Sequence, residues 1–181
     1  MKKILIISAS PRKCGNSDIL CDEFARGAKD AGHEVEKVRL AERKVAYCMG
    51  CYACRKLHKC VQNDDANELV AKMLAADAIV LATPVYFYSM DAQLKALIDR
   101  SVSRWGDFES FKGTEFWFIV TAADTSRDMM NATLEGLRGF TRDCMEGSVE
   151  RGVIYGTGAY EKGEVRSLPV MKEAYEAGLR A

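Results

Sequence analysis

The sequence predicts one doubly wound α/β domain, with a parallel sheet covered by helices on both faces. Short, almost continuous apolar runs, as at residues 3–8 and 78–83, are typical of strands buried on both faces. Between these runs lie segments with apolar residues at helical spacing, and this alternation produces parallel strands joined by right-handed crossovers. We expect residues 1–181 to form a single domain, because the chain contains no internal repeat, low-complexity tract or linker.

The expected elements alternate along the chain. The strands are expected at residues 3–8, 33–40, 78–83, 116–121 and 149–155. The first helix, which ends near Gly32, has an apolar face formed by Ile19, Leu20, Phe24 and Ala28. Asp65 and Glu68 form a capping box that predicts the start of a second helix, which continues to Ala76. Further helices are expected at residues 92–102, 127–146 and 170–178.

Charge and composition exclude several classes of function. Lys plus Arg and Asp plus Glu both total 26, so the formal net charge is zero. Nucleic acid is therefore not expected as a partner, since phosphate backbones require a basic surface. No run of 18 apolar residues and no signal-peptide pattern is present, so we expect no membrane association. Seven cysteines without an evenly spaced disulfide framework favour a reducing, cytoplasmic location.

Four of the cysteines lie within thirteen residues, in the spacing C-x2-C-x2-C-x5-C. They are Cys48, Cys51, Cys54 and Cys60. Successive C-x2-C steps followed by a further cysteine favour an iron–sulfur cluster, because structural zinc usually takes two such pairs separated by a longer stretch. Zinc, free thiols and a redox disulfide remain open alternatives. Cys14, Cys21 and Cys144 are isolated along the chain, and we interpret them as structural.

The loop after the first strand has the composition of a phosphate-binding loop. It contains Ser10, Arg12, Gly15, Asn16 and Ser17 and leads directly into a helix. Hydroxyl groups, a glycine and a helix N-terminus together form a set of donors suited to a phosphate. The nucleoside-triphosphate and dinucleotide glycine signatures are absent, so one terminal phosphate, as on FMN, fits best. The alternative is an ordinary strand-to-helix turn in which Asn16 or Ser17 caps the helix.

These motifs together resemble a known family. Ser10-Pro-Arg12 followed by Gly15-Asn16-Ser17 resembles the phosphate loop of the NAD(P)H-dependent FMN reductase group of flavodoxin-like proteins. The cysteine run at 48–60 and the segment Thr83-Pro-Val-Tyr-Phe87 are similar to the iron–sulfur flavoprotein branch of that group. Asp64-Asp65 and Asp99-Arg100 agree with the same branch, and the similarity covers about residues 1–125.

The resemblance implies a flavodoxin-like three-layer sandwich with a five-stranded parallel sheet in the order 2-1-3-4-5. It also implies bound FMN and a homodimer or homotetramer with the flavin near a subunit interface. The residues that match the phosphate site are Ser10, Arg12, Asn16 and Ser17, and those that match the ring site are Pro84, Val85, Tyr86 and Phe87. In cluster-bearing members the matching cysteines carry a [4Fe–4S] centre, here Cys48, Cys51, Cys54 and Cys60.

The residues themselves also support the ring site. A buried strand that ends at Thr83 brings Pro84 and two aromatic side chains to the carboxyl edge of the sheet, where ligands of such folds bind. Backbone N–H groups at this edge are suited to bond the flavin and tune its potential. The alternative is that Tyr86 and Phe87 are plain core or interface aromatics.

We therefore expect an FMN-dependent oxidoreductase that takes a hydride from NADH or NADPH. A flavin, a quinone-like molecule or a redox protein is the expected acceptor. Such chemistry depends on positioning and potential more than on a catalytic side chain, so no catalytic residue is assigned. The alternatives are an electron-transfer carrier reduced by ferredoxin-like partners through the cluster, and a zinc-stabilised binding module.

Overall fold

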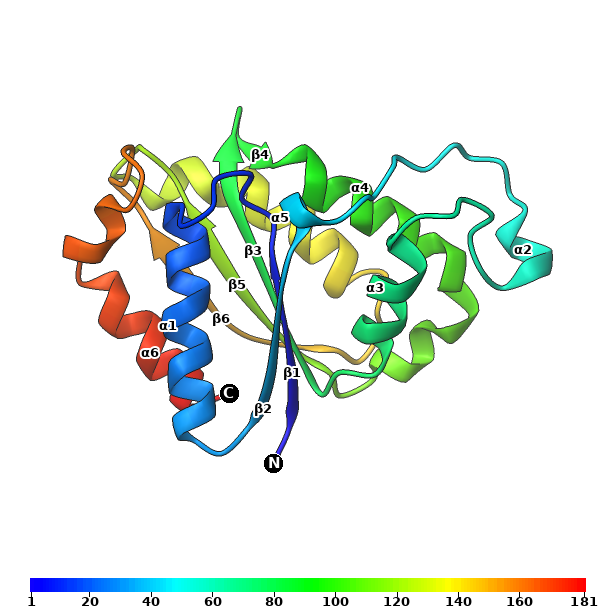
Figure 1. The fold of residues 1–181 in the computed structure, drawn as a ribbon, viewed down its shortest axis with the longest axis horizontal. Coiled ribbons are helices and arrows are strands. Elements are labelled where there is room, and N and C mark those ends of the chain that lie inside the picture. The colour runs from blue at the N-terminus through cyan, green and yellow to red at the C-terminus, as the bar shows by residue number, and fades with distance from the viewer.

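Five parallel strands form the centre of the computed structural model, which describes residues 1–181 without a gap (Figure 1). They are β1 (Lys3–Ser8), β2 (Glu34–Arg39), β3 (Ala78–Tyr86), β5 (Glu115–Thr121) and β6 (Val149–Gly156). Their order across the sheet is β2-β1-β3-β5-β6, which is the predicted order 2-1-3-4-5 of the parallel strands. The numbering differs because a short strand that the sequence analysis did not predict, β4 (Ser89–Met90), pairs antiparallel with β3.

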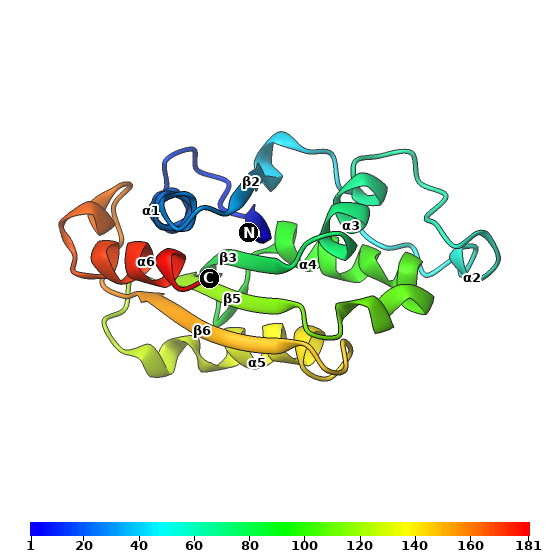
Figure 2. The same ribbon diagram turned by 90° about the horizontal axis from the view of Figure 1, so that it is seen from below.

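Helices cover both faces of this sheet (Figure 2). One face is covered by α1 (Asn16–Asp30) and α6 (Val170–Leu179), and the other by α3 (Ala66–Leu74), α4 (Ala92–Ser101) and α5 (Asn131–Thr141). A four-residue helix, α2 (Cys54–Leu57), lies in the cysteine region. The 3-10 turns are η1 (Leu40–Glu42), η2 (Val102–Phe111), η3 (Arg127–Met130) and η4 (Glu164–Ser167).

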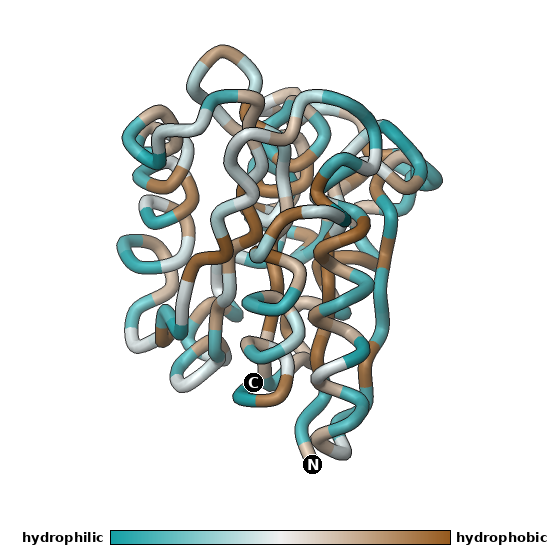
Figure 3. Tube along the Cα trace, turned by 90° about the vertical axis from the view of Figure 1, so that its left-hand side faces the viewer, coloured by the Kyte–Doolittle hydropathy of each residue, from teal (hydrophilic) through white to brown (hydrophobic).

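Alternation along the strands divides the core into two layers. Ile4 and Ile6 of β1 pack with α1 and α6, whereas Leu5 and Ile7 pack with α3, α4 and α5. The central strands are therefore apolar on both faces, and the polar residues lie on the outer sides of the helices (Figure 3). This explains why the buried strands were easy to predict from their continuous apolar runs.

Two sequence expectations need correction. The helix expected at residues 127–146 is shorter, because η3 precedes it and α5 ends at Thr141. Asp65 does precede α3, but its carboxylate accepts a hydrogen bond from the backbone N–H of Lys44 (2.7 Å) and does not cap the helix. The neighbouring Asp64 instead accepts from the first N–H of the helix, that of Ala66 (3.2 Å).

The carboxyl ends of the parallel strands meet at one edge of the sheet, where the loop between β1 and α1 and the hairpin of β3 and β4 lie (Figure 1). In open α/β sheets ligands bind at this edge. None of the helices combines the length and the apolar character that a membrane span requires.

Candidate functional site

The loop from β1 to α1 brings the predicted phosphate residues to the start of a fifteen-residue helix. Gly15 precedes the helix, and no side chain caps its first N–H groups. A Cβ atom at Gly15 would lie 2.8 Å from Ser10 Oγ and 2.9 Å from the carbonyl oxygen of Arg12, so only glycine fits without a shift of the loop. The uncapped helix N-terminus therefore offers its N–H groups and its positive end to an anion.

Ser17 provides the clearest sign of a ligand. Its hydroxyl is buried and has no hydrogen-bond partner in the protein. Buried polar groups rarely lack partners, so this hydroxyl is suited to bond a group that binds in the loop. Ser10 is also buried, and its Oγ makes only long contacts of 3.3 and 3.4 Å with the backbone of Arg12. The Arg12 side chain is exposed and forms no ion pair, and these features fit a phosphate group.

The side chain of Asn16 bonds the protein itself. Its side-chain amide donates to the carbonyl oxygens of Ala159 and Glu161, at 2.9 Å each. Its Oδ1 accepts from the N–H groups of Gly163 (3.0 Å) and Val165 (3.3 Å). All the hydrogen-bonding positions of the amide are thus used to attach the segment after β6. The side chain of Asn16 is therefore not free to bond a phosphate. Only its backbone N–H, at the start of α1, could do so.

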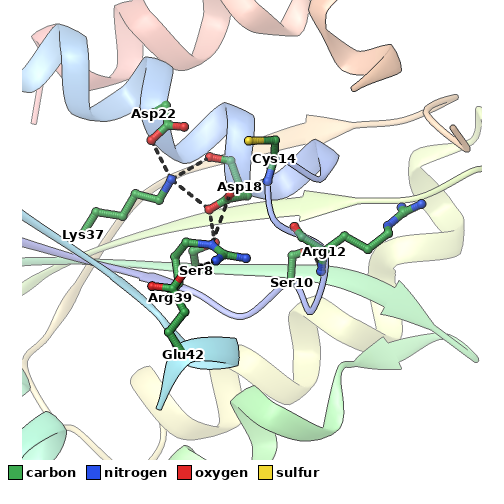
Figure 4. A network of polar contacts seen from close by, with 9 residues as sticks. All are labelled: Ser8, Ser10, Arg12, Cys14, Asp18, Asp22, Lys37, Arg39 and Glu42. Atoms are coloured by element: carbon green, nitrogen blue, oxygen red, sulfur yellow. Dashed lines mark hydrogen bonds and ion pairs between the residues drawn. The ribbon is translucent and has the colours of Figure 1, made fainter. Parts of the chain in front are cut away.

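A buried carboxylate, Asp18, stabilises the loop from behind (Figure 4). It accepts hydrogen bonds from Ser8 Oγ (2.8 Å) and from the backbone N–H of Cys14 (2.9 Å), and it pairs with Lys37 Nζ at 2.8 Å. Burial alone would raise the pKa of Asp18, but the bonds from Lys37, Ser8 and Cys14 outweigh it and lower that pKa. Arg39 Nε lies 3.4 Å from the other Asp18 oxygen. Lys37 and Arg39 thus offset the negative charge of Asp18, which would otherwise repel an anion bound in the loop.

The expected ring residues lie at the end of β3 and in its hairpin with β4. Pro84 is buried and Val85 half-buried, whereas Tyr86 is 45% exposed and Phe87 is fully exposed. Phe87 and the following Tyr88 have positive φ angles of 49° and 62°. Bulky residues rarely adopt this conformation, so the turn presents its aromatic side chains to solvent at a cost in strain. Tyr88, which directly continues the aromatic run, is an exposed aromatic that was not among the expected ring residues.

Beneath this hairpin lies a buried carboxyl group that the sequence analysis also missed. The backbone N–H of Asp91 donates to Thr83 Oγ1 (3.0 Å), and Asp91 Oδ1 accepts from the N–H of Leu94 (3.1 Å) to cap α4. Asp91 Oδ2 is buried without a partner, and burial raises the pKa of Asp91 to about 7. An aspartate before an apolar helical run is the usual signal of an N-cap and would have identified this residue.

The cysteine loop, residues 48–60, extends from the sandwich at the far side from α1 (Figures 1 and 2). Cys51 is exposed, and Cys48, Cys54 and Cys60 are half-buried. All four line one cavity of about 590 Å³, together with Arg100. No group of three or more cysteine, histidine or acidic side chains is arranged to hold a metal ion. The four thiols thus have the number and the chemistry that an iron–sulfur cluster requires, and they line one cavity. Their sulfur atoms do not converge on one point.

Hydrogen bonds from the domain fix both ends of this loop. Arg100 donates through Nη1 to the carbonyl oxygen of Ala46 (2.9 Å) and pairs with both carboxylate oxygens of Asp64, at 2.6 and 2.8 Å. Asn67 of α3 accepts from the N–H of Cys60 (3.0 Å) and donates to its carbonyl oxygen (3.1 Å). The backbone on either side of the four cysteines is therefore fixed even though the loop lies outside the core.

The three remaining cysteines lie elsewhere, and all seven are free thiols. Cys21 is fully buried in α1, and burial raises the pKa of its thiol to about 12, so it is not a reactive thiolate. Cys144 is half-buried at the end of the α5 region, and Cys14 is exposed in the phosphate loop. The burial of Cys21 agrees with the structural role expected of it, whereas the exposed Cys14 does not contribute to the core.

Comparison with known proteins gives a consistent result. The family model for NADPH-dependent FMN reductase matches residues 2–139. An iron–sulfur flavoprotein of Archaeoglobus fulgidus is 38% identical over 125 residues, which are 69% of this chain and 56% of that protein. An iron–sulfur flavoprotein of Methanosarcina thermophila is 46% identical over 100 residues, covering 55% and 52%. The chain spans about half the length of the curated relatives it matches.

Solved structures show the same fold at low sequence identity. An FMN-dependent NADH-azoreductase of Bacillus anthracis, in complex with FMN, superposes with a TM-score of 0.76 at 16% identity, covering 98% of both chains. An NAD(P)H:quinone oxidoreductase of Methanothermobacter marburgensis gives a TM-score of 0.76 at 17% identity, covering 99% of this chain and 95% of that one. Since the family model covers most of the sequence, this chain belongs to the NADPH-dependent FMN reductase family.

Proposed function

We propose that the protein is an FMN-dependent oxidoreductase that accepts a hydride from NADH or NADPH and passes electrons to an acceptor. The acceptor class is a flavin, a quinone-like molecule or a redox protein. The family supports this function. The structural observation that carries it is the buried, unpartnered Ser17 hydroxyl at the uncapped start of α1, beside a hairpin of exposed aromatics.

In this proposal the FMN phosphate binds at the β1–α1 loop. Ser17 Oγ and Ser10 Oγ donate to its oxygens, and the first backbone N–H groups of α1 add to them. Arg12, which has no other ionic partner, closes over the phosphate as a charged donor. The Asn16 side chain acts indirectly, by attaching the segment after β6 to the base of the loop, while its backbone N–H is one of the first of α1.

The flavin ring then lies against the hairpin of β3 and β4. Pro84 and Val85 form its apolar floor, and Tyr86 and Phe87 supply aromatic surface that the domain itself leaves exposed. When bound, FMN supplies the redox chemistry, because it accepts a hydride as an electron pair and can release electrons singly. The protein contributes position, water exclusion and hydrogen bonds, and no side chain is required as an acid or base.

Anaerobic mixing of the FMN-loaded protein with NADH and with NADPH tests this proposal. We expect one of the two to bleach the flavin absorbance within seconds and the reduced protein to reoxidise with a quinone. A flavin that neither nucleotide reduces would contradict the nicotinamide-dependent activity. It would favour the second function, an electron carrier that a ferredoxin-like partner reduces.

We further propose that Cys48, Cys51, Cys54 and Cys60 hold a [4Fe–4S] cluster. Four thiols around one cavity, fixed at both ends by Arg100 and Asn67, support this assignment. The names of the iron–sulfur flavoproteins above point the same way. Metal binding commonly completes such a site, because the ligands converge only when the inorganic core is present.

Iron, zinc and sulfide analysis of protein purified without oxygen tests the cluster. We expect iron and sulfide in equal amounts and no zinc. Stoichiometric zinc without sulfide would show a zinc-stabilised module instead, and metal-free protein with four titratable thiols would show free thiols or a redox pair.

We also propose that the protein forms a homodimer or homotetramer in a reducing cytoplasm. The exposed aromatic turn supports association, because solvent-facing aromatics in a strained turn are typical of surfaces that bind a partner or ligand. The free thiols fit a reducing compartment. Light scattering of the FMN-loaded protein tests the oligomer, and a monomer at micromolar concentration would contradict it.

A further inference from the structure

A buried arginine connects the cysteine loop to the core. Arg100, in the last turn of α4, is 1% exposed and is the largest fully buried side chain of the protein. Its guanidinium pairs with Asp64 through two bonds and donates to the carbonyl oxygen of Ala46. Arginine is almost never fully buried unless it is paired, so its position reflects a specific role.

One donor of this guanidinium remains unused. Nε of Arg100 is buried and has no hydrogen-bond partner. Arg100 lies in the wall of the cavity that the four cysteines line, next to Cys60. The backbone of Cys60 is in turn fixed by Asn67, so Cys60 is kept at the wall of the cavity to which Arg100 also belongs.

We propose that Arg100 is a positioning residue for the cluster, which orients Cys60 and donates its Nε–H to the Cys60 sulfur. This inference rests on the proposed cluster. Reduction adds negative charge that the ligating sulfurs share, and an N–H donor to a sulfur stabilises the reduced form. Because Asp64 offsets the charge of the guanidinium, the directional donor carries most of the effect.

Three substitutions separate the donor from the charge. Arg100→Lys keeps a cation beside Asp64 but removes the Nε–H, and Arg100→Gln removes both. Asp64→Asn keeps an acceptor for Arg100 but removes the offsetting negative charge. Lys95→Gln is the matched control, because Lys95 is on the same helix and pairs with Asp99 at the exposed surface.

Each variant is loaded with iron and sulfide without oxygen, and the cluster potential is measured by a redox titration followed by electron paramagnetic resonance. Circular dichroism and FMN content report the fold. We expect a lower midpoint in Arg100→Lys and Arg100→Gln, with an oxidised-to-reduced ratio about tenfold higher at a fixed potential, or about 59 mV for one electron. We expect a higher midpoint in Asp64→Asn and no change in Lys95→Gln.

The outcomes distinguish this inference from the cluster proposal. Wild-type protein that takes up no iron and sulfide would refute the cluster and, with it, the role of Arg100. Loaded Arg100→Lys with an unchanged midpoint would refute the role of Arg100 alone. A shift in the same direction in Arg100→Lys and Asp64→Asn would indicate a general disturbance of the loop and would also overturn the inference.

Discussion

The phosphate loop and the cysteine loop lie well apart in the molecule and are stabilised in different ways (Figures 1 and 2). The phosphate loop joins the central strand β1 to the buried helix α1, and Asp18 and Asn16 bond it internally. The cysteine loop lies outside both core layers and contains one four-residue helix with no buried residue. Only its two ends are fixed, by Arg100 and Asn67.

This difference indicates two ways to build a cofactor site. The phosphate loop has its donors in place before any ligand binds, so binding requires little ordering of the chain. In the proposed cluster site the four thiols line one cavity without converging, so part of the free energy of cluster binding would be used to order the loop. Substitutions in one region should therefore leave the other region intact.

The largest effect is expected from Cys54→Ser in the cysteine loop. Loss of one thiolate ligand should abolish iron and sulfide content, because the loop alone does not hold the site together. FMN content should remain at the wild-type level. Cys14→Ser, at an exposed cysteine outside this loop, is the control and should retain iron. Loss of FMN together with iron in Cys54→Ser would show that the two regions are coupled.

The matching substitution in the phosphate loop is Gly15→Ala. The new Cβ would meet the carbonyl oxygen of Arg12 at 2.9 Å, so the loop must shift away from its donor geometry. FMN affinity should fall by about 10- to 100-fold, or roughly 1.4–2.8 kcal/mol, with iron content unchanged. In Gly139→Ala, on α5, the new Cβ meets no atom within 4 Å, so FMN affinity should not change. Equal affinities in both variants would exclude a preformed loop.

Asn16→Ala tests the internal bonding of the same region. It leaves four backbone groups of the segment after β6 without their partner, so the free energy of unfolding should fall by about 3 kcal/mol. Asn131→Ala is the matched control, because Asn131 also begins a helix but makes only a 3.5 Å contact with Asp128. Urea unfolding measures both, and equal stabilities would contradict the assigned role of Asn16.

The hairpin of β3 and β4 and the base of the cysteine loop also differ in their response to pH. The raised pKa of Asp91, about 7, means that the folded protein binds a proton that the unfolded chain releases near pH 4, so its contribution to stability falls as pH rises between these values. Asp64 has a lowered pKa, and its contribution is lost only as pH falls below about 4.

Asp91→Asn tests the contribution of Asp91, beneath the hairpin, to the pH dependence of stability. Asparagine keeps the acceptor for Leu94 but stays neutral, so the variant should lack the decline of about 2 kcal/mol that Asp91 causes between about pH 5.5 and 8. Urea unfolding across this range measures it. A variant with the same pH dependence as the wild type would show that Asp91 ionises normally.

The sequence predicted the regular part of the molecule well, because it depends on local patterns. Apolar runs located buried strands such as β1 and β3, and the alternating Val35 and Val38 located β2. The residue types of the loop after β1 indicated a phosphate site directly. The β4 hairpin was missed because its turn consists of Phe87 and Tyr88 at positive φ, without the usual glycine or asparagine signal. Such a turn is specified by its surroundings and not by its own residues.

Long-range partners explain the other misses. The phosphate-binding role expected of Asn16 stays a prediction for its backbone N–H, because its side-chain amide bonds residues more than 140 positions away. Asp65 appeared to cap α3, but a backbone N–H from an earlier segment takes its carboxylate. The burial of Arg100 could not be predicted from neighbouring residues, because its partners Ala46 and Asp64 come from the two ends of the cysteine loop. Only the assembled fold reveals these contacts.

The most direct test of the account is the affinity of the FMN-free protein for FMN in Ser17→Ala, measured by the quenching of flavin fluorescence. A lost hydrogen bond to a charged phosphate costs about 1.5–3 kcal/mol, so Kd should rise about tenfold or more while the free energy of unfolding stays unchanged. Ser103→Ala removes another buried, unpartnered hydroxyl outside the phosphate loop and should leave Kd unchanged. An unchanged Kd in Ser17→Ala would contradict the phosphate site at the start of α1.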